Sequence, residues 1–380
     1  KYKSESNPSP QYDHSLRGKM RNSLTLPPDE VSELIAKDTR RVVRIRMPEN
    51  ETVQLNDMIR GQVEFNTSLL DDKVLLKADG MPTYHLAVVV DDYLMKISHA
   101  FRGEEWLPSS PVHLLLWKYL GWEKDMPAWA HLPLILGPQG KLSKRDALKY
   151  GFPVFAMNWK DPATGELTEG FREKGFLPEA FVNFLALLGW NDGSEQEVFT
   201  LQELISRFSL DRVHASGAKF DYEKAKWFNH EWIKRSDDSI FIQHLLSKHR
   251  ASADYAAKVV KLVKDRCVLL TDLFDQSFYF FEAPAAPDFS SIRPKWTDAK
   301  SDFFQAFADE MDAIDTWEAA FIEDAFKKVA TLQGIKPGEL QLPFRIMLVG
   351  GKFGPPVFDI AAVLGREETV ARVRKSIPLI

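Results

Sequence analysis

The chain has 380 residues and a formal net charge of −5 at pH 7, with 44% hydrophobic and 27% charged residues. A single hydrophobic core rarely grows beyond about 250–300 residues, so this length predicts roughly two to four domains. The acidic balance excludes a nucleic-acid footprint spread over the whole chain, so any RNA contact must be local. A single cysteine, Cys267, excludes a disulfide framework and a cysteine-based zinc site, and no apolar run reaches the ~18 residues of a membrane span.

The first part of the chain is predicted to be α+β. A helix is expected over residues 29–37, directly after Pro27-Pro28. Apolar and polar residues alternate over 41–47, 61–65 and 73–77, which predicts strands with one solvent-exposed face.

From Thr83 the pattern becomes more apolar. A helix is predicted over 84–95, a strand over 96–101, a second helix over 110–120 and a second strand over 129–136. The second helix has a strong start signal, a serine hydroxyl followed by proline in the first turn. Strand, helix and strand in this order predict a βαβ unit, in which ligands lie beyond the carboxyl ends of the strands.

Two polar loops follow these strands, and we expect them to carry the chemistry: RGEEW at 102–106 and GPQGKLSKR at 137–145. The second loop places Lys141, Lys144 and Arg145 within five residues, after a Gly-Pro-Gln-Gly turn. Lysines supply compact charges for a polyphosphate, and glycines let such a loop close. Taken alone, the run is more typical of a solvated basic turn. Beyond Pro178 the pattern is mainly helical, with helices predicted over 179–188, 201–208 and 222–234 and several more to the end.

Longer segments carry a family resemblance. Residues 77–106 (KADGMPTYHLAVVVDDYLMKISHAFRGEEW) resemble the bacterial-type glutamyl-tRNA synthetases, which are class I aminoacyl-tRNA synthetases. KLSKR is similar to that family's version of the class I KMSKS loop. The resemblance continues through 175–190 (GFLPEAFVNFLALLGW), 220–230 (FDYEKAKWFNH) and 342–373 (LPFRIMLVGGKFGPPVFDIAAVLGREETVARV). The joint match is specific, whereas KLSKR by itself is not.

The resemblance implies a multidomain α/β plus all-α fold. On that template residues 1–83 are the acceptor-stem-binding insertion of a Rossmann-type catalytic domain, and 84–140 are the second half of that domain. Residues 141–235 are the stem-contact domain with the KLSKR loop, and 236–380 the helical anticodon-binding domain. The family's HIGH-type motif has no counterpart here. We therefore expect the sequence to lack the N-terminal part of the catalytic domain and to be inactive alone.

The resemblance also implies site residues. The catalytic charges are Lys141 and Lys144. The ATP site involves Lys144, Ser143, Leu134, Ile135 and Trp106. Arg102 and Tyr84 would hold glutamate, Arg345 would contact tRNA, and no residue is assigned to a metal. The alternatives are a structural ion pair of Arg102 with Glu104 or Asp91, and core packing for Tyr84 and Trp106.

The activity implied by the resemblance is ATP-dependent ligation of L-glutamate to tRNA(Glu) through glutamyl-adenylate. It implies ATP and Mg²⁺ as cofactors, no zinc, a cytoplasmic location, no membrane and a monomer. The alternatives are an enzyme that also charges tRNA(Gln) and a non-catalytic RNA-binding protein derived from a synthetase. A glutaminyl-tRNA synthetase is disfavoured, because that family ends in β-barrels whereas this C-terminal part is predicted to be helical.

Charge is unevenly distributed toward the C-terminus. Residues 341–380 carry six Lys and Arg residues against three acidic ones. This local excess predicts a surface for RNA phosphates near the C-terminus. A solvated helix face is an equally good interpretation.

Overall fold

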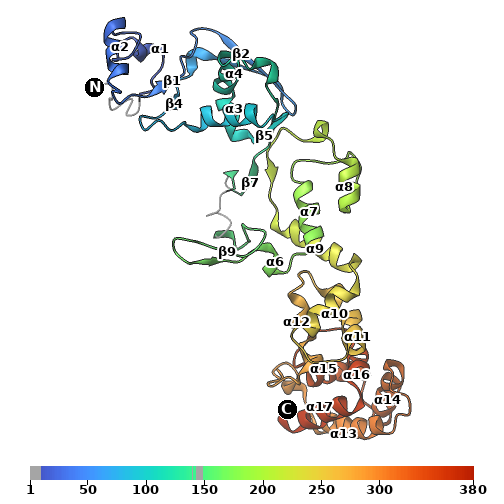
Figure 1. Ribbon diagram of the computed structural model, residues 1–380. Coiled ribbons are helices and arrows are strands. Elements are labelled where there is room, and N and C mark those ends of the chain that lie inside the picture. Colours follow the sequence, from blue (N-terminus) through green and yellow to red (C-terminus); the bar gives the residue numbers. More distant parts are fainter. Residues whose placement is uncertain (1–9, 139, 143–148) are drawn as a thin grey trace. The chain divides into compact units, whose positions relative to one another are not determined.

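The computed structural model describes residues 10–138, 140–142 and 149–380. The chain forms two compact units, whose elements are labelled in Figure 1. The first unit contains Lys1–Ser143, Ala186–Glu197 and Gln202–Phe220, and the second contains Lys144–Leu185, Val198–Leu201 and Asp221–Ile380. Among the described helices, none combines the length and the apolar character that crossing a membrane requires.

A four-stranded sheet lies at the centre of the first unit. Its strands stand in the order β3 (Gly61–Asn66), β2 (Thr52–Asp57), β6 (Ala128–Leu132) and β5 (His99–Gly103). Strands β2 and β3 form an antiparallel hairpin, whereas β5 and β6 run parallel from the pair His99↔Ala128 to the pair Gly103↔Leu132. Helix α4 (Ser110–Tyr119) connects β5 to β6, so the predicted βαβ unit is confirmed. The sequence pattern did not predict β2.

Helices α3 (Tyr84–Leu94) and α4 enclose one hydrophobic core with this sheet. Trp117 of α4 is fully buried in it, together with Leu55 of β2 and Trp129 of β6. Burial of each such side chain contributes about 1.5–3 kcal/mol. Met47 belongs to the same core, so residues on both sides of position 83 are packed together.

The strand predicted over 129–136 is wrong in its second half. It ends at Leu132, and the chain resumes as β7 (Ile135–Gly137) in a different sheet, between β8 (Gly140–Lys141) and β11 (Ala218–Lys219). Pro133 lies at the break. Proline has no N–H to donate to a neighbouring strand, which interrupts the ladder at this point.

Short elements complete the first unit: α1 (His14–Arg17), α2 (Pro28–Ala36), β1 (Val43–Arg44), β4 (Val74–Leu76) and α8 (Leu201–Arg207). The helix predicted over 29–37 is therefore confirmed. The strand predicted over 41–47 shrinks to the two residues of β1, which pair with β4 across an irregular register. Beyond β1, the N–H of Met47 donates to the carboxylate of Asp72 at 2.9 Å instead of continuing the ladder.

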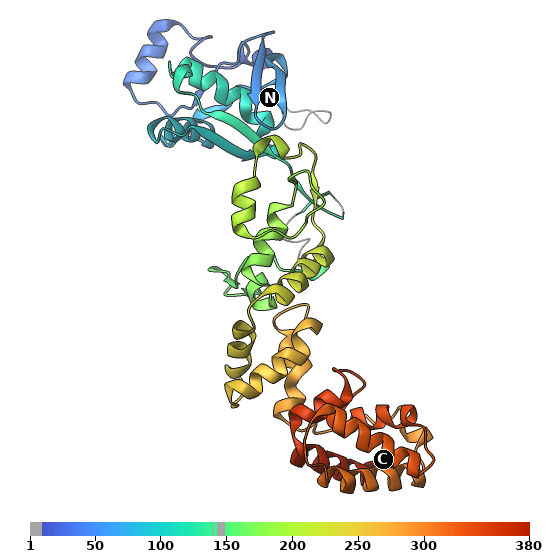
Figure 2. The ribbon, with the colours of Figure 1, turned by 90° about the vertical axis from the view of Figure 1, so that its right-hand side faces the viewer.

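The second unit is mainly helical, as predicted. It contains the hairpin β9 (Trp159–Lys160) and β10 (Leu167–Thr168), followed by α6 (Phe171–Lys174), α7 (Pro178–Ala186), α9 (Tyr222–Arg235), α10 (Asp238–Leu246), α11 (Ala253–Val263), α12 (Asp272–Phe281), α13 (Asp298–Asp312), α14 (Ala319–Leu332), α15 (Pro337–Val349), α16 (Val357–Leu364) and α17 (Arg366–Ser376). Figure 2 shows these helices from a second direction.

Aromatic side chains form the centre of the helical core. Phe303 and Phe307 of α13 meet Phe326 of α14 edge-to-face, with ring centroids 5.2 and 5.1 Å apart. Phe307 meets Phe344 of α15 in the same way at 5.3 Å. Edge-to-face pairs add about 0.5–1.5 kcal/mol each beyond the area they bury. These contacts join α13, α14 and α15 into one packed body.

A buried amide joins α9 to two loops of the second unit. The side chain of Asn229 is fully buried, and its Oδ1 accepts the N–H of Leu177 at 2.7 Å. Its Nδ2 donates to the carbonyl oxygens of Gly175 at 3.2 Å and Val268 at 2.7 Å. Gly175 has φ +97°, and a Cβ there would lie 2.7 Å from the backbone nitrogen of Thr271, so only glycine fits this junction.

Candidate active site

Arg102 lies near the carboxyl end of the parallel strand β5, where the βαβ pattern predicts ligands. Its Nη2 donates to Oδ2 of Asp92 on α3 at 3.2 Å, and its Nη1 donates to the carbonyl of Phe101 at 2.9 Å. The carboxylate partner is thus Asp92, not Glu104 or Asp91 as the structural alternative expected. Burial raises the pKa of Asp92, an effect that Arg102 opposes and Asp91 reinforces. Within the described chain, the two bonds use two of the five N–H donors of a guanidinium.

Tyr84 and Trp106 form a ring pair beside this strand end. Tyr84 is the first residue of α3, and Trp106 lies in the 3₁₀ helix η2 (Glu104–Ser109). Their ring centroids are 4.5 Å apart with a 40° tilt. Tyr84 is 41% exposed and Trp106 38% exposed, which argues against the alternative that either is a core residue.

Lys141 reaches the same strand end from β8. Its Nζ donates to Oε1 of Glu105 at 2.8 Å, and both side chains are solvent-exposed. The hydrogen bond from Lys141 lowers the pKa of Glu105. The other two predicted loop residues, Ser143 and Lys144, lie outside the described residues.

Leu134 and Ile135 lie at the start of β7. Their carbonyl oxygens accept hydrogen bonds from the N–H of Ala218 at 2.8 Å and of Leu142 at 2.9 Å. Ile135 is 42% exposed. A contact between ATP and the backbone of Leu134 and Ile135 would have to share these carbonyls or use an N–H group.

The turn between β2 and β3 supplies polar groups that the sequence pattern did not predict. Arg60 pairs with Glu104 at 2.9 Å and also donates to the carbonyls of His131 at 3.3 Å and Ala215 at 3.0 Å. It thereby anchors the first residue of η2. A local signal was present: Asp57 followed by Gly61 is typical of a turn, and Gly61 has φ +71°.

Asp57 locks this turn to β6. Its Oδ2 accepts from Nδ1 of His131 at 2.6 Å, and its Oδ1 accepts the N–H groups of Ile59 and Arg60, each at 3.0 Å. Burial alone would raise the pKa of Asp57, but the hydrogen bonds from His131 and from the backbone outweigh it and lower the pKa. The buried carboxylate is thus held in its ionised form.

The Asp57 contact predicts a pH effect on stability. Because the folded-state pKa is lowered from 3.8, the contribution of Asp57 is full above pH 3.8 and is lost as the pH falls through the lower folded value. The free energy of unfolding should therefore fall more steeply below pH 3.8 in the wild type than in Asp57→Asn. Urea denaturation at a series of pH values measures both slopes. Parallel slopes would contradict the prediction.

Known proteins match both units of this fold. A family model described as the catalytic domain of class I tRNA synthetases (E and Q) matches residues 3–227, and an anticodon binding domain model matches residues 223–377. Over 381 residues the chain is 47% identical to a glutamate–tRNA ligase of Porphyromonas gingivalis, covering 98% of this chain and 75% of that protein. The chain belongs to the glutamate–tRNA ligase family. A relative of the same name from Flavobacterium psychrophilum is 48% identical over 374 residues, 96% of this chain and 74% of that protein.

Two solved structures of this family have the same fold. One is a glutamate tRNA ligase from Elizabethkingia meningosepticum in complex with its amino acid, with a TM-score of 0.91 and 40% identity. The other is a glutamate-tRNA synthetase from Elizabethkingia anophelis, with a TM-score of 0.88 and 41% identity. Each comparison covers 97% of this chain and 74% of the other. The expected fold class, a class I catalytic domain followed by a helical anticodon-binding domain, is confirmed.

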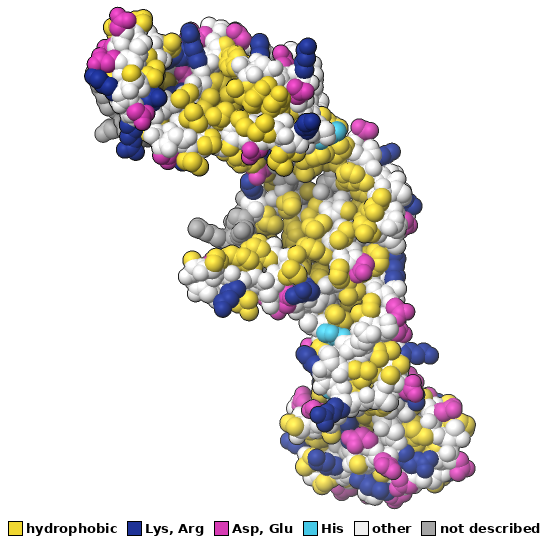
Figure 3. All heavy atoms as spheres, viewed as in Figure 1, with side chains coloured by type: hydrophobic (Ala, Val, Ile, Leu, Met, Phe, Trp, Pro, Cys, Tyr) yellow, Lys and Arg dark blue, Asp and Glu magenta, His cyan; other side chains and the backbone are white. Residues whose placement is uncertain are grey.

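The C-terminal cations are less available than their number suggests. Arg345 donates to the carbonyls of Phe353 and Pro355, and burial lowers its pKa. Three other arginines of the segment bind carbonyls or carboxylates of the second unit: Arg366, Arg372 and Arg374. On the face in Figure 3, basic and acidic side chains are interspersed over this part. The local excess of basic residues is therefore weak evidence for an RNA-binding surface. The role of Arg345 in tRNA binding stays a prediction.

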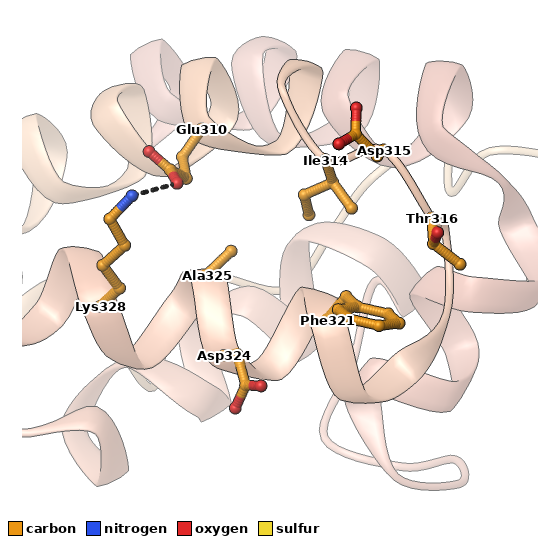
Figure 4. A pocket seen from close by; sticks show the side chains of 8 residues that line it. All are labelled: Glu310, Ile314, Asp315, Thr316, Phe321, Asp324, Ala325 and Lys328. Carbon is orange, nitrogen blue, oxygen red and sulfur yellow. Dashed lines mark hydrogen bonds and ion pairs between the residues drawn. The ribbon is translucent and has the colours of Figure 1, made fainter.

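An open pocket of about 520 Å³ lies in the second unit, and none of the predicted site residues lines it. Figure 4 shows its lining: Glu310, Ile314, Asp315, Thr316, Phe321, Asp324, Ala325 and Lys328. The Nζ of Lys328 is paired with Glu310 at 2.7 Å. Three acids against one paired lysine do not suit a phosphate ligand.

Proposed function

We propose that the whole protein ligates L-glutamate to tRNA(Glu) in an ATP-dependent reaction that passes through glutamyl-adenylate. The observation that carries the proposal is the grouping of Arg102, Tyr84 and Trp106 at the carboxyl end of β5. The relatives named glutamate–tRNA ligase and the neighbour solved with its amino acid support it. The proposed setting is the cytoplasm, with the chain acting as a monomer.

In this proposal Arg102 binds the side-chain carboxylate of glutamate. Asp92 holds the guanidinium from one side, and the remaining donors form the planar fork that suits a carboxylate. The hydroxyl of Tyr84 donates a further hydrogen bond, and the Tyr84–Trp106 pair forms an apolar wall beside the substrate. Glutamine would leave the guanidinium without a matching charge, so the site would reject it.

Activation is the attack of the glutamate α-carboxylate on the α-phosphorus of ATP. A new carboxyl oxygen–phosphorus bond forms, and pyrophosphate leaves with the bonding electrons. The nucleophile is already ionised, so the site needs no general base. Lys141 and Lys144 contribute positioning and charge neutralisation, to which Mg²⁺ held on the ATP phosphates would add.

Mg²⁺ would enter with ATP, because Mg²⁺ in such sites is held largely by substrate phosphates.

The direct test is charging of tRNA(Glu) with labelled glutamate, measured on the whole protein. Charging should depend on ATP, and glutamine should not replace glutamate. Charging of tRNA(Gln) in the same assay would identify the non-discriminating alternative. Binding of tRNA without any charging would favour a non-catalytic RNA-binding protein.

The loop lysines should act on the phosphates and not on glutamate. Lys141→Ala and Lys144→Ala should each lower kcat for glutamate-dependent pyrophosphate exchange by about tenfold or more, because their charges matter most in the transition state. The KM for glutamate should change by less than about twofold, since the substitutions leave the contacts that bind glutamate in the ground state in place.

Lys118 is an exposed lysine in the last turn of α4 and provides the control. Lys118→Ala should keep the wild-type kcat and the wild-type KM for glutamate. If the loop variants lost tRNA affinity while adenylation stayed normal, the loop would be an RNA contact instead.

A further inference from the structure

Two histidine rings meet the ring of Tyr84. His85 follows Tyr84 on α3, and His113 projects from α4. Both rings lie edge-on to Tyr84, with centroids 6.1 and 6.0 Å away. The Nδ1 of His85 and the Nε2 of His113 are 3.0 Å apart, and His113 is 3% exposed. Two neutral imidazoles can make this bond only if one donates and the other accepts, so each ring fixes the tautomer of the other.

The pair is held in the uncharged state. Burial lowers the pKa of His113 to about 3, and the nearby charges of His85, Arg102 and His131 act in the same direction. Burial is also the main cause that lowers the pKa of His85, with Lys73 adding to it and Asp71 opposing it. Neither ring therefore adds a positive charge beside Arg102 at ordinary pH.

Tyr84 is poorly fixed by burial, because 41% of its surface is exposed. Its orientation depends on neighbouring rings: Trp106 at a centroid distance of 4.5 Å, and the two histidines. His113 is itself stacked on Trp129 of β6 at 6.0 Å with an interplanar angle of 19°, which ties the pair to the sheet. The hydrogen bond between the histidines thus connects the rings that contact Tyr84 to the sheet, through His113 and Trp129.

We propose that His113 is a positioning residue for glutamate binding: through its hydrogen bond to His85 it sets the direction of the Tyr84 hydroxyl. This inference rests on the proposed role of Tyr84 in the glutamate pocket.

Two variants separate the hydrogen bond from the packing. His113→Phe keeps a ring that stacks on Trp129 but removes the nitrogen, which leaves Nδ1 of His85 without this partner. His113→Gln returns an amide group near the position of Nε2. The KM for glutamate in pyrophosphate exchange should rise about tenfold in His113→Phe, because a hydrogen-bonding group loses its match. His113→Gln should recover most of that loss. The KM for ATP should stay close to wild type in both variants, and so should the Tm of His113→Phe.

The link through Tyr84 is tested with Tyr84→Phe, which keeps the ring and removes the hydroxyl. If His113 acts by aiming that hydroxyl, His113→Phe adds little to the KM for glutamate in the Tyr84→Phe background. Additive effects would overturn the inference, and so would a parallel rise in both KM values with a lowered Tm. Arg102→Leu shows whether a negative result concerns only the positioning role of His113 or the whole proposed glutamate site. If Arg102→Leu raises the KM for glutamate but His113→Phe does not, the positioning role is wrong and the site stands. If neither variant changes it, the proposed glutamate site is wrong as well.

Discussion

Replacement of Arg102 by leucine should lower kcat/KM for glutamate by about 100-fold or more, because removing one partner of a largely desolvated charge pair costs about 2–5 kcal/mol. Leucine keeps part of the aliphatic stem but provides no donor for the substrate carboxylate. The KM for ATP should change little, since the guanidinium faces Asp92 and not the Lys141 loop. Glutamate-dependent pyrophosphate exchange on the whole protein measures both constants.

Two further variants make this result specific. Arg102→Lys keeps the charge and loses the fork, so its kcat/KM should fall between those of wild type and Arg102→Leu. Arg207→Leu removes a guanidinium from an ion pair with Asp192, also in the first unit, and should keep wild-type kinetics. Normal glutamate kinetics in Arg102→Leu would reduce Arg102 to a structural partner of Asp92.

Replacement of Asn229 by leucine should destabilise the helical unit by about 3–5 kcal/mol, because each buried polar group left unpaired costs about 1–3 kcal/mol. Leucine has the same branched arrangement of side-chain heavy atoms as asparagine, so the substitution leaves no cavity and the loss reports mainly the missing hydrogen bonds. The N–H of Leu177 and the carbonyls of Gly175 and Val268 would all lose this partner.

Urea denaturation followed by far-UV circular dichroism measures this loss. Gln305→Leu, at an exposed position of α13 in the same unit, should change the free energy of unfolding by less than about 0.5 kcal/mol. A loss below about 1 kcal/mol in Asn229→Leu would mean that the neighbouring groups find other partners.

The elements around the site were predictable where the signal was local. Helix α4 has a serine and a proline at its start, and α3 and β5 are marked by apolar runs that end in polar residues. Strand β2 has no such signal. Its inward face consists of Val53, Leu55 and the polar Asp57, and its assignment as a strand depends on pairing with β3 and β6. Such nonlocal pairing is not visible in a single sequence.

The contacts of individual site residues were less predictable than the residues themselves. Asp91 and Asp92 differ by about 100° around helix α3, so the phase of that helix against β5 decides which one meets Arg102. The partners of Arg345 likewise depend on the fold and not on the local sequence. Its charge counts toward a basic segment, but the fold turns the guanidinium toward the carbonyls of Phe353 and Pro355. Composition gives the number of cations but not their partners.

The β2–β3 hairpin and the site share a backbone ladder. Strand β2 lies between β3 and β6, the N–H of Met58 donates to the carbonyl of Trp129 at 2.8 Å, and Asp57 binds His131 beside it. A hinge at this point would have to break these bonds together. The hairpin and β6 should therefore open as one cooperative unit, and the amide of Met58 should exchange with solvent deuterium as slowly as the amides of β6. A displacement of the hairpin would then reach Arg102 directly, as a shift of the strand next to β5.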